Sequence, residues 1–200
     1  MKILNDLLPK SYQQELYNLL SSANFPWYYS PTSVPTNPDN FQWAVDDNTV
    51  DTSQFVHTFY YNNQRLSDFY NIIQPILLFA EYHTGEVFNK VHRVKANLLT
   101  KNQSIQENQY TTPHTDEYLI NSGGDSKYKT LLYYVNDSDG ETTFFKERFA
   151  YYTRYKELTL DTKIKPTQGT CAIFDSNIFH CSKPPSKFDN RIVINIVLEK

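Results

Sequence analysis

Glycine is unusually scarce in this sequence. The chain has 5 glycines among 200 residues, about 2.5% against an average share of about 7%. Their positions do not fit GxGxxG, GxxxxGK[ST] or GxSxG, the glycine patterns of phosphate loops and nucleophile elbows; they are Gly85, Gly123, Gly124, Gly140 and Gly169. The sequence therefore excludes a dinucleotide-binding enzyme with that fingerprint, a P-loop NTPase and a serine α/β-hydrolase.

Charge of one sign is also lacking. Lys and Arg number 19 and Asp and Glu 22, which gives a net charge of -3. A protein that binds nucleic acid through bulk electrostatics is normally basic. The composition thus gives no strong nucleic-acid signal, and we look first for a peptide, protein or small-molecule substrate, with a nucleobase as a further alternative.

Cysteines and long apolar runs are few. Cys171 and Cys181 are the only cysteines and form no CxxC pair, which favours two reduced thiols. The first residues are interrupted by Asp6 and Pro9, so they do not resemble a signal peptide. The richest apolar stretch, 75–80, is far too short to span a bilayer. These features predict a cytoplasmic protein with no membrane segment.

Aromatic residues, by contrast, are abundant, at 16% of the chain. The first part of the sequence predicts helices over 10–22 and 67–84, with Pro75 either kinking the second or starting a new segment. Apolar and β-branched runs then predict strands with no helical period between them. The expected strands are 41–45, 54–60, 91–100, 129–136, 141–145, 157–160, 169–174 and 191–198. Such a run of strands favours an antiparallel sandwich or jelly roll.

Three short segments carry chemistry. In His114-Thr115-Asp116, residues i and i+2 of an extended chain face the same way, so the imidazole and the carboxylate can hold one metal ion. Alone, this pattern also suits a turn or a strand-edge hydrogen bond. His180 follows an apolar strand, where a histidine taken alone is more often structural. Eleven residues later stands Arg191, in a strand whose opposite face is plainly core.

Combined, these residues are more specific. Two histidines and a carboxylate form a facial triad that fills three positions on Fe(II) and leaves others open. An arginine deeper in the same barrel would bind a dicarboxylate in bidentate fashion. Asn195 lies on the same strand face as Arg191, and an unpaired polar group buried there would cost several kcal/mol, so both need partners.

The order and spacing of His114, Asp116, His180 and Arg191 resemble the Fe(II)/2-oxoglutarate-dependent oxygenase superfamily. The similarity is to its prolyl 4-hydroxylase-like branch and that branch's short phage-type members. A second family block is matched by 133–136 (Tyr-Tyr-Val-Asn) and 140–142 (Gly-Glu-Thr). The resemblance covers about residues 91–200, and it departs from the family at Asp139, where the usual pair is Gly-Gly.

The resemblance implies a single domain, 1–200. Residues 91–200 would form a double-stranded β-helix core, a jelly roll like that of cupins, and 1–90 a helical and variable support region. The fold would thus be mainly β with N-terminal helices. The implied metal ligands are His114, Asp116 and His180, with no catalytic residue beyond them; the implied cosubstrate-binding residues are Arg191, Tyr134, Asn195 and Asn97.

The implied activity is that of a dioxygenase that uses Fe(II), 2-oxoglutarate and O2, with ascorbate as a candidate reductant. It would hydroxylate a substrate that the sequence leaves unidentified, with prolyl residues of a peptide as the leading candidate, and would form succinate and CO2. The alternative is a catalytically silent jelly-roll binding or interaction protein. Its sequence mark would be loss of a metal ligand or of the arginine, and this chain keeps all four.

Overall fold

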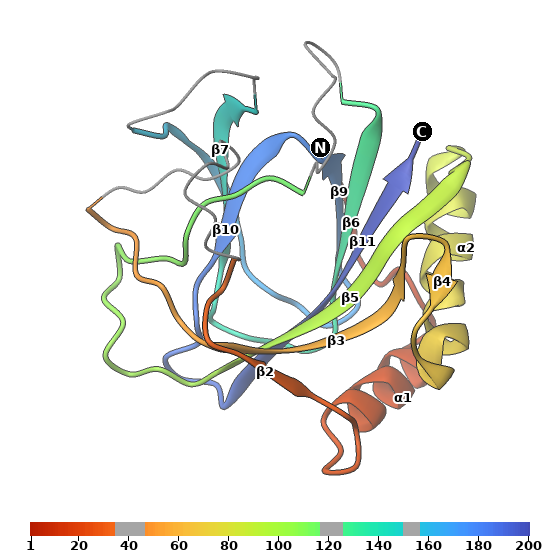
Figure 1. The fold of residues 1–200 in the computed structure, drawn as a ribbon, viewed down its shortest axis with the longest axis horizontal. Helices are drawn as coiled ribbons and strands as arrows, with labels where there is room; N and C mark the ends of the chain where they lie inside the picture. Colours follow the sequence, from red (N-terminus) through yellow and green to blue (C-terminus); the bar gives the residue numbers. More distant parts are fainter. Residues whose placement is uncertain (35–46, 117–125, 150–156) are drawn as a thin grey trace.

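Two antiparallel sheets form the body of the protein. The computed structural model describes residues 1–34, 47–116, 126–149 and 157–200. Within them the larger sheet has the strand order β1 (Lys2–Leu4), β9 (Cys171–Asp175), β6 (Tyr128–Tyr134), β11 (Asn190–Glu199), β5 (Lys90–Thr100), β3 (Gln54–Tyr61) and β2 (Tyr28–Ser30), with β4 (Gln64–Arg65) paired to β3. The smaller sheet has the order β10 (Ile178–Ser182), β7 (Thr142–Arg148) and β8 (Leu160–Ile164). The sheets curve around a common interior (Figure 1), which is the predicted jelly roll.

The helices cover one outer face of the larger sheet. Helix α1 (Lys10–Leu20) and helix α2 (Gln74–Thr84), which follows the 3-10 helix η1 (Asp68–Ile73), lie beside β3 and β5 in Figure 1. Pro75 stands in the first turn of α2, where its missing N–H costs no helical hydrogen bond. Gly85 ends α2 at φ 67°, a left-handed conformation that glycine adopts without strain. Pro75 thus starts a new segment rather than kinking a single helix.

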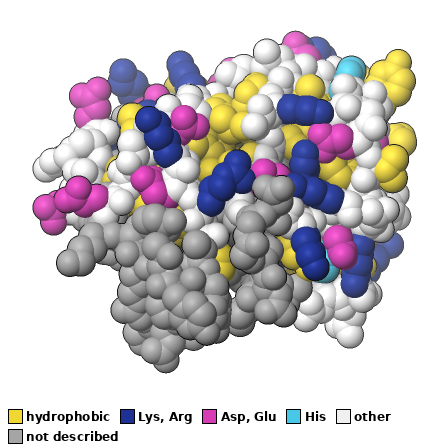
Figure 2. All heavy atoms as spheres, turned by 90° about the horizontal axis from the view of Figure 1, so that it is seen from above, with side chains coloured by type: hydrophobic (Ala, Val, Ile, Leu, Met, Phe, Trp, Pro, Cys, Tyr) yellow, Lys and Arg dark blue, Asp and Glu magenta, His cyan; other side chains and the backbone are white. Residues whose placement is uncertain are grey.

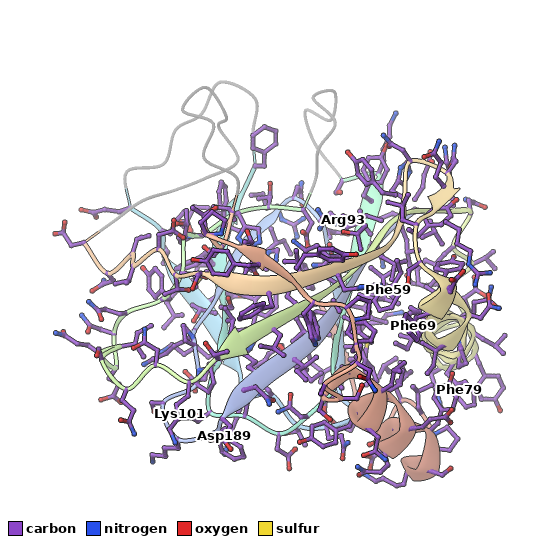
Figure 3. All side chains as sticks on the ribbon, turned by 60° about the horizontal axis from the view of Figure 1, so that its bottom comes forward. Phe59, Phe69, Phe79, Arg93, Lys101 and Asp189 are labelled. Atoms are coloured by element: carbon purple, nitrogen blue, oxygen red, sulfur yellow. The ribbon has the colours of Figure 1, made fainter. Side chains whose placement is uncertain are left out.

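Apolar burial occurs on both faces of the larger sheet. Four apolar residues on one face of β11 are fully buried against the helices together with Phe59: Ile192, Ile194, Ile196 and Leu198. Figure 3 places Phe59 and Phe69 on this helix side. A second cluster, which includes Phe144, Phe174 and Val193, fills the space between the two sheets. The remaining interior of the barrel is polar, and it contains the site described below.

Several predicted elements differ from the structure. The predicted strand 157–160 overlaps β8 only at Leu160, because β8 pairs with β7 from Leu160 onward. Strand β10, which carries His180, was not predicted, since its five residues include Cys181 and Ser182 and show no apolar alternation. The predicted strand 41–45 lies outside the described residues. Both cysteines are free and buried, as expected.

The surface carries both charge signs. On the face drawn in Figure 2, Lys and Arg side chains are interspersed with Asp and Glu among the described residues. No helix in the described part of the chain is long and apolar enough to cross a membrane.

Candidate metal centre

His114 and His180 lie directly opposite each other on neighbouring segments. Each backbone N–H donates to the other residue's carbonyl at 2.9 Å, so the two form an isolated antiparallel bridge. This bridge places both imidazoles on the same side, with ring centroids 4.7 Å apart. The pairing between β10 and the segment before residue 117 thus brings together two histidines that are distant in the sequence.

Asp116 completes the group. Its backbone N–H donates to the carbonyl of Ser176, in the turn before β10, at 2.9 Å. Its Oδ2 lies 3.5 Å from Nε2 of His180. One ligand atom from each of His114, Asp116 and His180 lies within 4.8 Å of the others. The three residues predicted to bind a metal are therefore together.

The hydrogen bonds of the two imidazoles fix which nitrogen faces the metal position. Nδ1 of His114 lies 3.0 Å from the Thr112 carbonyl, and Nδ1 of His180 lies 3.1 Å from the Ile178 carbonyl. A carbonyl only accepts, so each Nδ1 carries a hydrogen, and in the neutral ring Nε2 is the nitrogen with a lone pair for the metal. Burial lowers the pKa of His114 to about 4, and its neighbour His180 adds to this effect. His114 is therefore neutral near pH 7, as metal coordination requires.

The Asp116 carboxylate is held from three directions. Arg93 Nη2 donates to Oδ1 at 2.6 Å, while Asn195 Nδ2 and Thr130 Oγ1 donate to Oδ2 at 2.9 and 3.0 Å. Burial alone would raise the pKa of Asp116, but the Arg93 guanidinium, the two histidines and the Asn195 hydrogen bond together outweigh it and hold the pKa well below its usual range. The carboxylate is thus ionised and fixed in orientation.

This donor set fits a divalent iron ion. Two imidazole nitrogens and one carboxylate on one side of a cavity are the ligands of the facial-triad class of non-haem Fe(II) sites. Each ligand has a hydrogen-bond partner that orients it, as is usual for residues that bind a metal.

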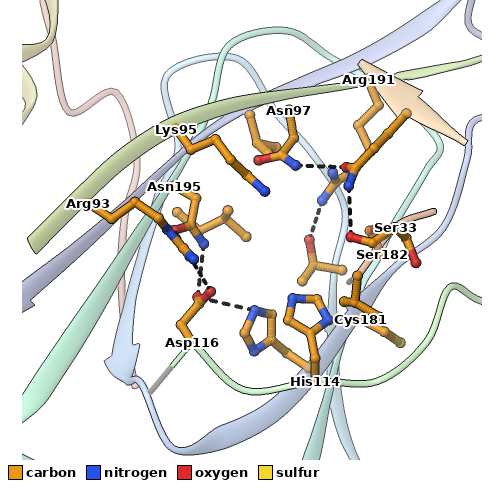
Figure 4. Close-up of a pocket in the computed structure, with 16 residues that line it drawn as sticks. Ser33, Arg93, Lys95, Asn97, His114, Asp116, Cys181, Ser182, Arg191 and Asn195 are labelled. Atoms are coloured by element: carbon orange, nitrogen blue, oxygen red, sulfur yellow. Dashed lines mark hydrogen bonds and ion pairs between the residues drawn. The ribbon is translucent and has the colours of Figure 1, made fainter. Parts of the chain in front are cut away.

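The triad lies in a cavity whose far end contains Arg191 (Figure 4). Alternate residues of β5 and β11 point into this cavity because the side chains of a strand alternate between its two faces. From β5 these are Arg93, Lys95 and Asn97; from β11 they are Arg191, Val193 and Asn195. Of the residues predicted to bind the cosubstrate, Arg191, Asn195 and Asn97 therefore line the same cavity as the triad.

Arg191 is buried and held by two neighbours. Nε donates to the Gly140 carbonyl at 2.7 Å, and Nη2 donates to Thr142 Oγ1 at 2.7 Å. The Tyr134 hydroxyl donates to the same Thr142 oxygen at 2.8 Å. Tyr134 is buried beside Arg191 and is not among the residues that line the cavity. The contact predicted between Tyr134 and the cosubstrate therefore stays a prediction. Thr142, which accepts the Tyr134 hydrogen bond, lines the cavity in its place.

Thr142 is consequently oriented as a donor. A hydroxyl has two acceptor lone pairs and one hydrogen. Tyr134 and Arg191 each donate to the Thr142 oxygen, so its own hydrogen is left to point elsewhere. Because Thr142 lines the cavity, a ligand oxygen bound at Arg191 can accept that hydrogen.

The backbone around Arg191 also explains why Asp139-Gly140 stands here in place of the usual Gly-Gly pair. A Cβ at Gly140 would lie 2.3 Å from the Lys183 carbonyl and 3.0 Å from Cδ of Arg191, so glycine is required there. Asp139 takes another role. Its carboxylate accepts hydrogen bonds from the Ser186 hydroxyl at 2.6 Å and from the backbone N–H groups of Ser186, Lys187 and Phe188. It thereby fixes the turn that leads into β11.

The two asparagines have defined partners. Asn97 Nδ2 donates to Gln54 Oε1 at 2.7 Å, within the cavity lining. Asn195 accepts from Arg93 at 2.9 Å and donates to Asp116. Both the oxygen and the nitrogen of the Asn195 side-chain amide are thus used in holding the metal-binding carboxylate and its partner Arg93. Contact of Asn97 or Asn195 with a cosubstrate stays a prediction.

Arg93, Lys95 and Thr142 are among the residues of this cavity that were not assigned from the sequence. The signal for two of them was present, because Arg93, Lys95 and Asn97 alternate with the apolar Val94 and Ala96. Polar residues at period two mark a strand face directed at water or at a ligand. Burial lowers the pKa of Lys95 to about 8, with a further contribution from Arg93.

Comparison with known proteins gives a family and a fold. Residues 100–198 match the family model of the 2OG-Fe(II) oxygenase superfamily. A comparison with curated protein sequences found no match.

Three similar solved structures have the same fold at low sequence identity. The epimerase SnoN from nogalamycin biosynthesis has a TM-score of 0.61 at 15% identity, covering 99% of this chain and 77% of its own. A Pseudomonas putida prolyl-4-hydroxylase has 0.55 at 11%, covering 100% and 91%. The viral collagen prolyl hydroxylase of Paramecium Bursaria Chlorella virus-1 has 0.52 at 14%, covering 100% and 96%.

Proposed function

We propose that this chain, which belongs to the 2OG-Fe(II) oxygenase superfamily, hydroxylates a C–H bond of its substrate. The observation that carries the proposal is the complete triad of His114, Asp116 and His180 in one cavity with a buried arginine. When bound, Fe(II) with 2-oxoglutarate and O2 supplies the oxidation, and 2-oxoglutarate leaves as succinate and CO2. Residues 91–200 would form the catalytic core, and 1–90 its support.

The chain's own residues position the reactants. Nε2 of His114, Nε2 of His180 and the carboxylate of Asp116 would hold the metal. Arg191 would bind the far carboxylate of 2-oxoglutarate, since a guanidinium matches a carboxylate in bidentate fashion. The Thr142 hydroxyl would donate to the same carboxylate, with Tyr134 holding Thr142 in place from behind.

Asn195 and Asn97 would act at different distances from the metal position. Asn195 would keep Asp116 oriented while lying beside the cosubstrate. Asn97 lies deeper, next to Gln54, and would contact the cosubstrate between the metal and Arg191. Both roles rest on the position of these residues in the cavity lining.

A prolyl residue of a peptide is the first substrate to test. The motif resemblance supports this choice, and the fold is shared with two prolyl hydroxylases. SnoN and SnoK, also of this fold, are an epimerase and a carbocyclase, so a small-molecule substrate should be tested in parallel. Ascorbate would serve as the reductant in such assays.

The alternative is a jelly-roll protein that binds ligands without catalysis. It would be favoured by a missing metal ligand or by the loss of the arginine. The four residues concerned are present and share a cavity, so the enzyme is the better-supported function.

Succinate formation tests the proposal. The protein is loaded with Fe(II) and 2-oxoglutarate without oxygen, and succinate is then measured after air is admitted. We expect slow succinate release even without a substrate, and its loss in His114→Ala and Asp116→Ala. His83→Ala, at an exposed histidine of α2, is the matched control. A wild type that forms no succinate, or triad variants that form as much as wild type, would contradict the enzyme.

A further inference from the structure

Lys95 is the one cation of the cavity for which the described residues offer no partner. Arg93 is paired with Asp116, and Arg191 donates to Gly140 and Thr142. The Lys95 side chain, by contrast, makes no hydrogen bond or ion pair with any described residue. In Figure 4 its amine points into the cavity, and no dashed line reaches it.

The charges of the lining leave Lys95 uncompensated. Among the described residues, Asp116 is the only acidic side chain that lines this cavity, and it faces Arg93 at 2.6 Å. Lys95 and Arg191 therefore contribute two positive charges with no carboxylate to balance them. Burying an ammonium group without a counterion is unfavourable. A site that retains one is suited to an anionic ligand.

Lys95 and Arg191 face different parts of the cavity. Lys95 is paired in register with Asn195, whose amide donates to Asp116. Arg191 is paired with Leu99, four residues further along β5, which is about 13 Å at the rise of a strand. Lys95 is thus at the level of the triad, and Arg191 at the remote end.

We propose that Lys95 is a carboxylate-binding residue at the metal end of the cavity, separate from the Arg191 anchor. The proposal rests on the function proposed above. Two molecules could bring the carboxylate: 2-oxoglutarate, through its carboxylate nearer the metal, or the substrate that is oxidised. The lysine acts as a positioning cation in either case, since an ammonium group is a point charge with rotatable donors.

The first arm of the test measures cosubstrate affinity. Calorimetry without oxygen follows the binding of 2-oxoglutarate to Mn(II)-loaded wild type, Lys95→Met and Lys95→Arg. Lys90→Met is the matched control, because Lys90 begins the same strand and is exposed. If the cosubstrate supplies the carboxylate, Lys95→Met should bind 2-oxoglutarate about tenfold more weakly. Lys95→Arg should recover part of the loss, and Lys90→Met should bind like wild type.

The second arm uses a small carboxylate in place of the substrate. Propionate and its uncharged analogue propionamide are added to the protein loaded with Mn(II), with and without 2-oxoglutarate. Broadening of their methyl NMR signals by Mn(II) reports binding near the metal. If the substrate supplies the carboxylate, wild type with 2-oxoglutarate should broaden propionate more than propionamide. Lys95→Met should lose this difference while its 2-oxoglutarate affinity stays within twofold.

The outcomes separate the two proposals. A change in either arm that Lys90→Met lacks supports the role of Lys95. Unchanged cosubstrate affinity together with unchanged propionate broadening in a folded Lys95→Met variant overturns it. Wild type that binds Mn(II) but not 2-oxoglutarate would contradict the proposed function, while the propionate arm without 2-oxoglutarate would still test the lysine.

Discussion

Arg93 Nη2 lies 2.6 Å from Oδ1 of Asp116, and the pair joins β5 to the metal-binding segment. The side chains are 10% and 3% exposed, so little water screens the interaction. Figure 3 shows Arg93 toward one end of the sheet, whereas Lys101 and Asp189 lie beyond the other end of β5. The pair compensates the charge of Asp116 before any metal binds, and it leaves Oδ2 facing His180.

Removing Arg93 should destabilise the metal-free protein. Arg93→Met leaves the buried carboxylate without its cation, which should lower the free energy of unfolding by about 3 kcal/mol at pH 7. The double variant Arg93→Met, Asp116→Asn should recover much of this loss, because no uncompensated charge remains. Urea unfolding of the four proteins of this cycle gives the coupling free energy. Additive effects of the two changes would contradict the coupling.

The same coupling between Arg93 and Asp116 predicts that the free energy of unfolding depends on pH. The pKa of Asp116 is held below its usual range in the folded protein, so the stabilisation is present above the ordinary pKa of about 4 and is lost as pH falls through the lower folded value. In Arg93→Met the folded pKa of Asp116 should be higher, and the carboxylate should be neutralised on mild acidification. The difference in unfolding free energy between wild type and variant should therefore be smaller at pH 3 than at pH 7. A difference that grew on acidification would contradict the assignment.

Lys95 should give a second pH dependence of stability, with the same sign but in the alkaline range. Its pKa is lowered to about 8 by burial, against an ordinary value of about 10.4. Between these values the unfolded chain binds more protons than the folded chain, so stability rises with pH. Metal-free Lys95→Met should therefore be more stable than wild type by about 1–3 kcal/mol at pH 7. Its advantage should shrink between pH 8 and pH 10 (about the span of the two values), as measured by urea unfolding, with Lys90→Met as the control.

Thr142→Val should weaken cosubstrate binding. Without its oxygen, Tyr134 loses its acceptor, Arg191 loses one of its two, and the ligand loses a donor. We expect about tenfold weaker binding of 2-oxoglutarate and a loss of about 1–3 kcal/mol in stability. Thr142→Ser keeps the hydroxyl and should bind like wild type, and Tyr134→Phe should fall between the two. Calorimetry with the Mn(II)-loaded protein distinguishes these cases, and equal affinity in Thr142→Val would exclude a role for the hydroxyl.

Gly140→Ala should displace the Arg191 anchor. The new Cβ would lie 2.3 Å from a backbone oxygen, which cannot move as a flexible side chain would. Because the Gly140 carbonyl also accepts from Arg191 Nε, we expect lower thermal stability and weaker 2-oxoglutarate binding together. Gly85→Ala adds strain at a positive φ but has open space around its Cβ. It should lower the free energy of unfolding by about 1 kcal/mol and leave 2-oxoglutarate binding unchanged.

The sequence by itself determined the ligand types and most of the strands. His114, Asp116, His180 and Arg191 could be recognised because their spacing is specific and because each residue type has a fixed chemistry. Which side chains share a face of β5 and of β11 can likewise be predicted from the sequence, since side chains on a strand alternate faces whatever the strand pairs with.

Only the tertiary structure decided which groups touch. That Thr142 is shared by Tyr134 and Arg191 follows from the packing of β7 beside the larger sheet. That Arg93 and Asn195 hold Asp116, and that Lys95 has no partner among the described residues, follow from the register between β5 and β11. A shift of one residue in that register would turn every side chain to the other face. Such pairing joins residues far apart in the chain, so no local pattern encodes it, and the charge balance of the cavity depends on it.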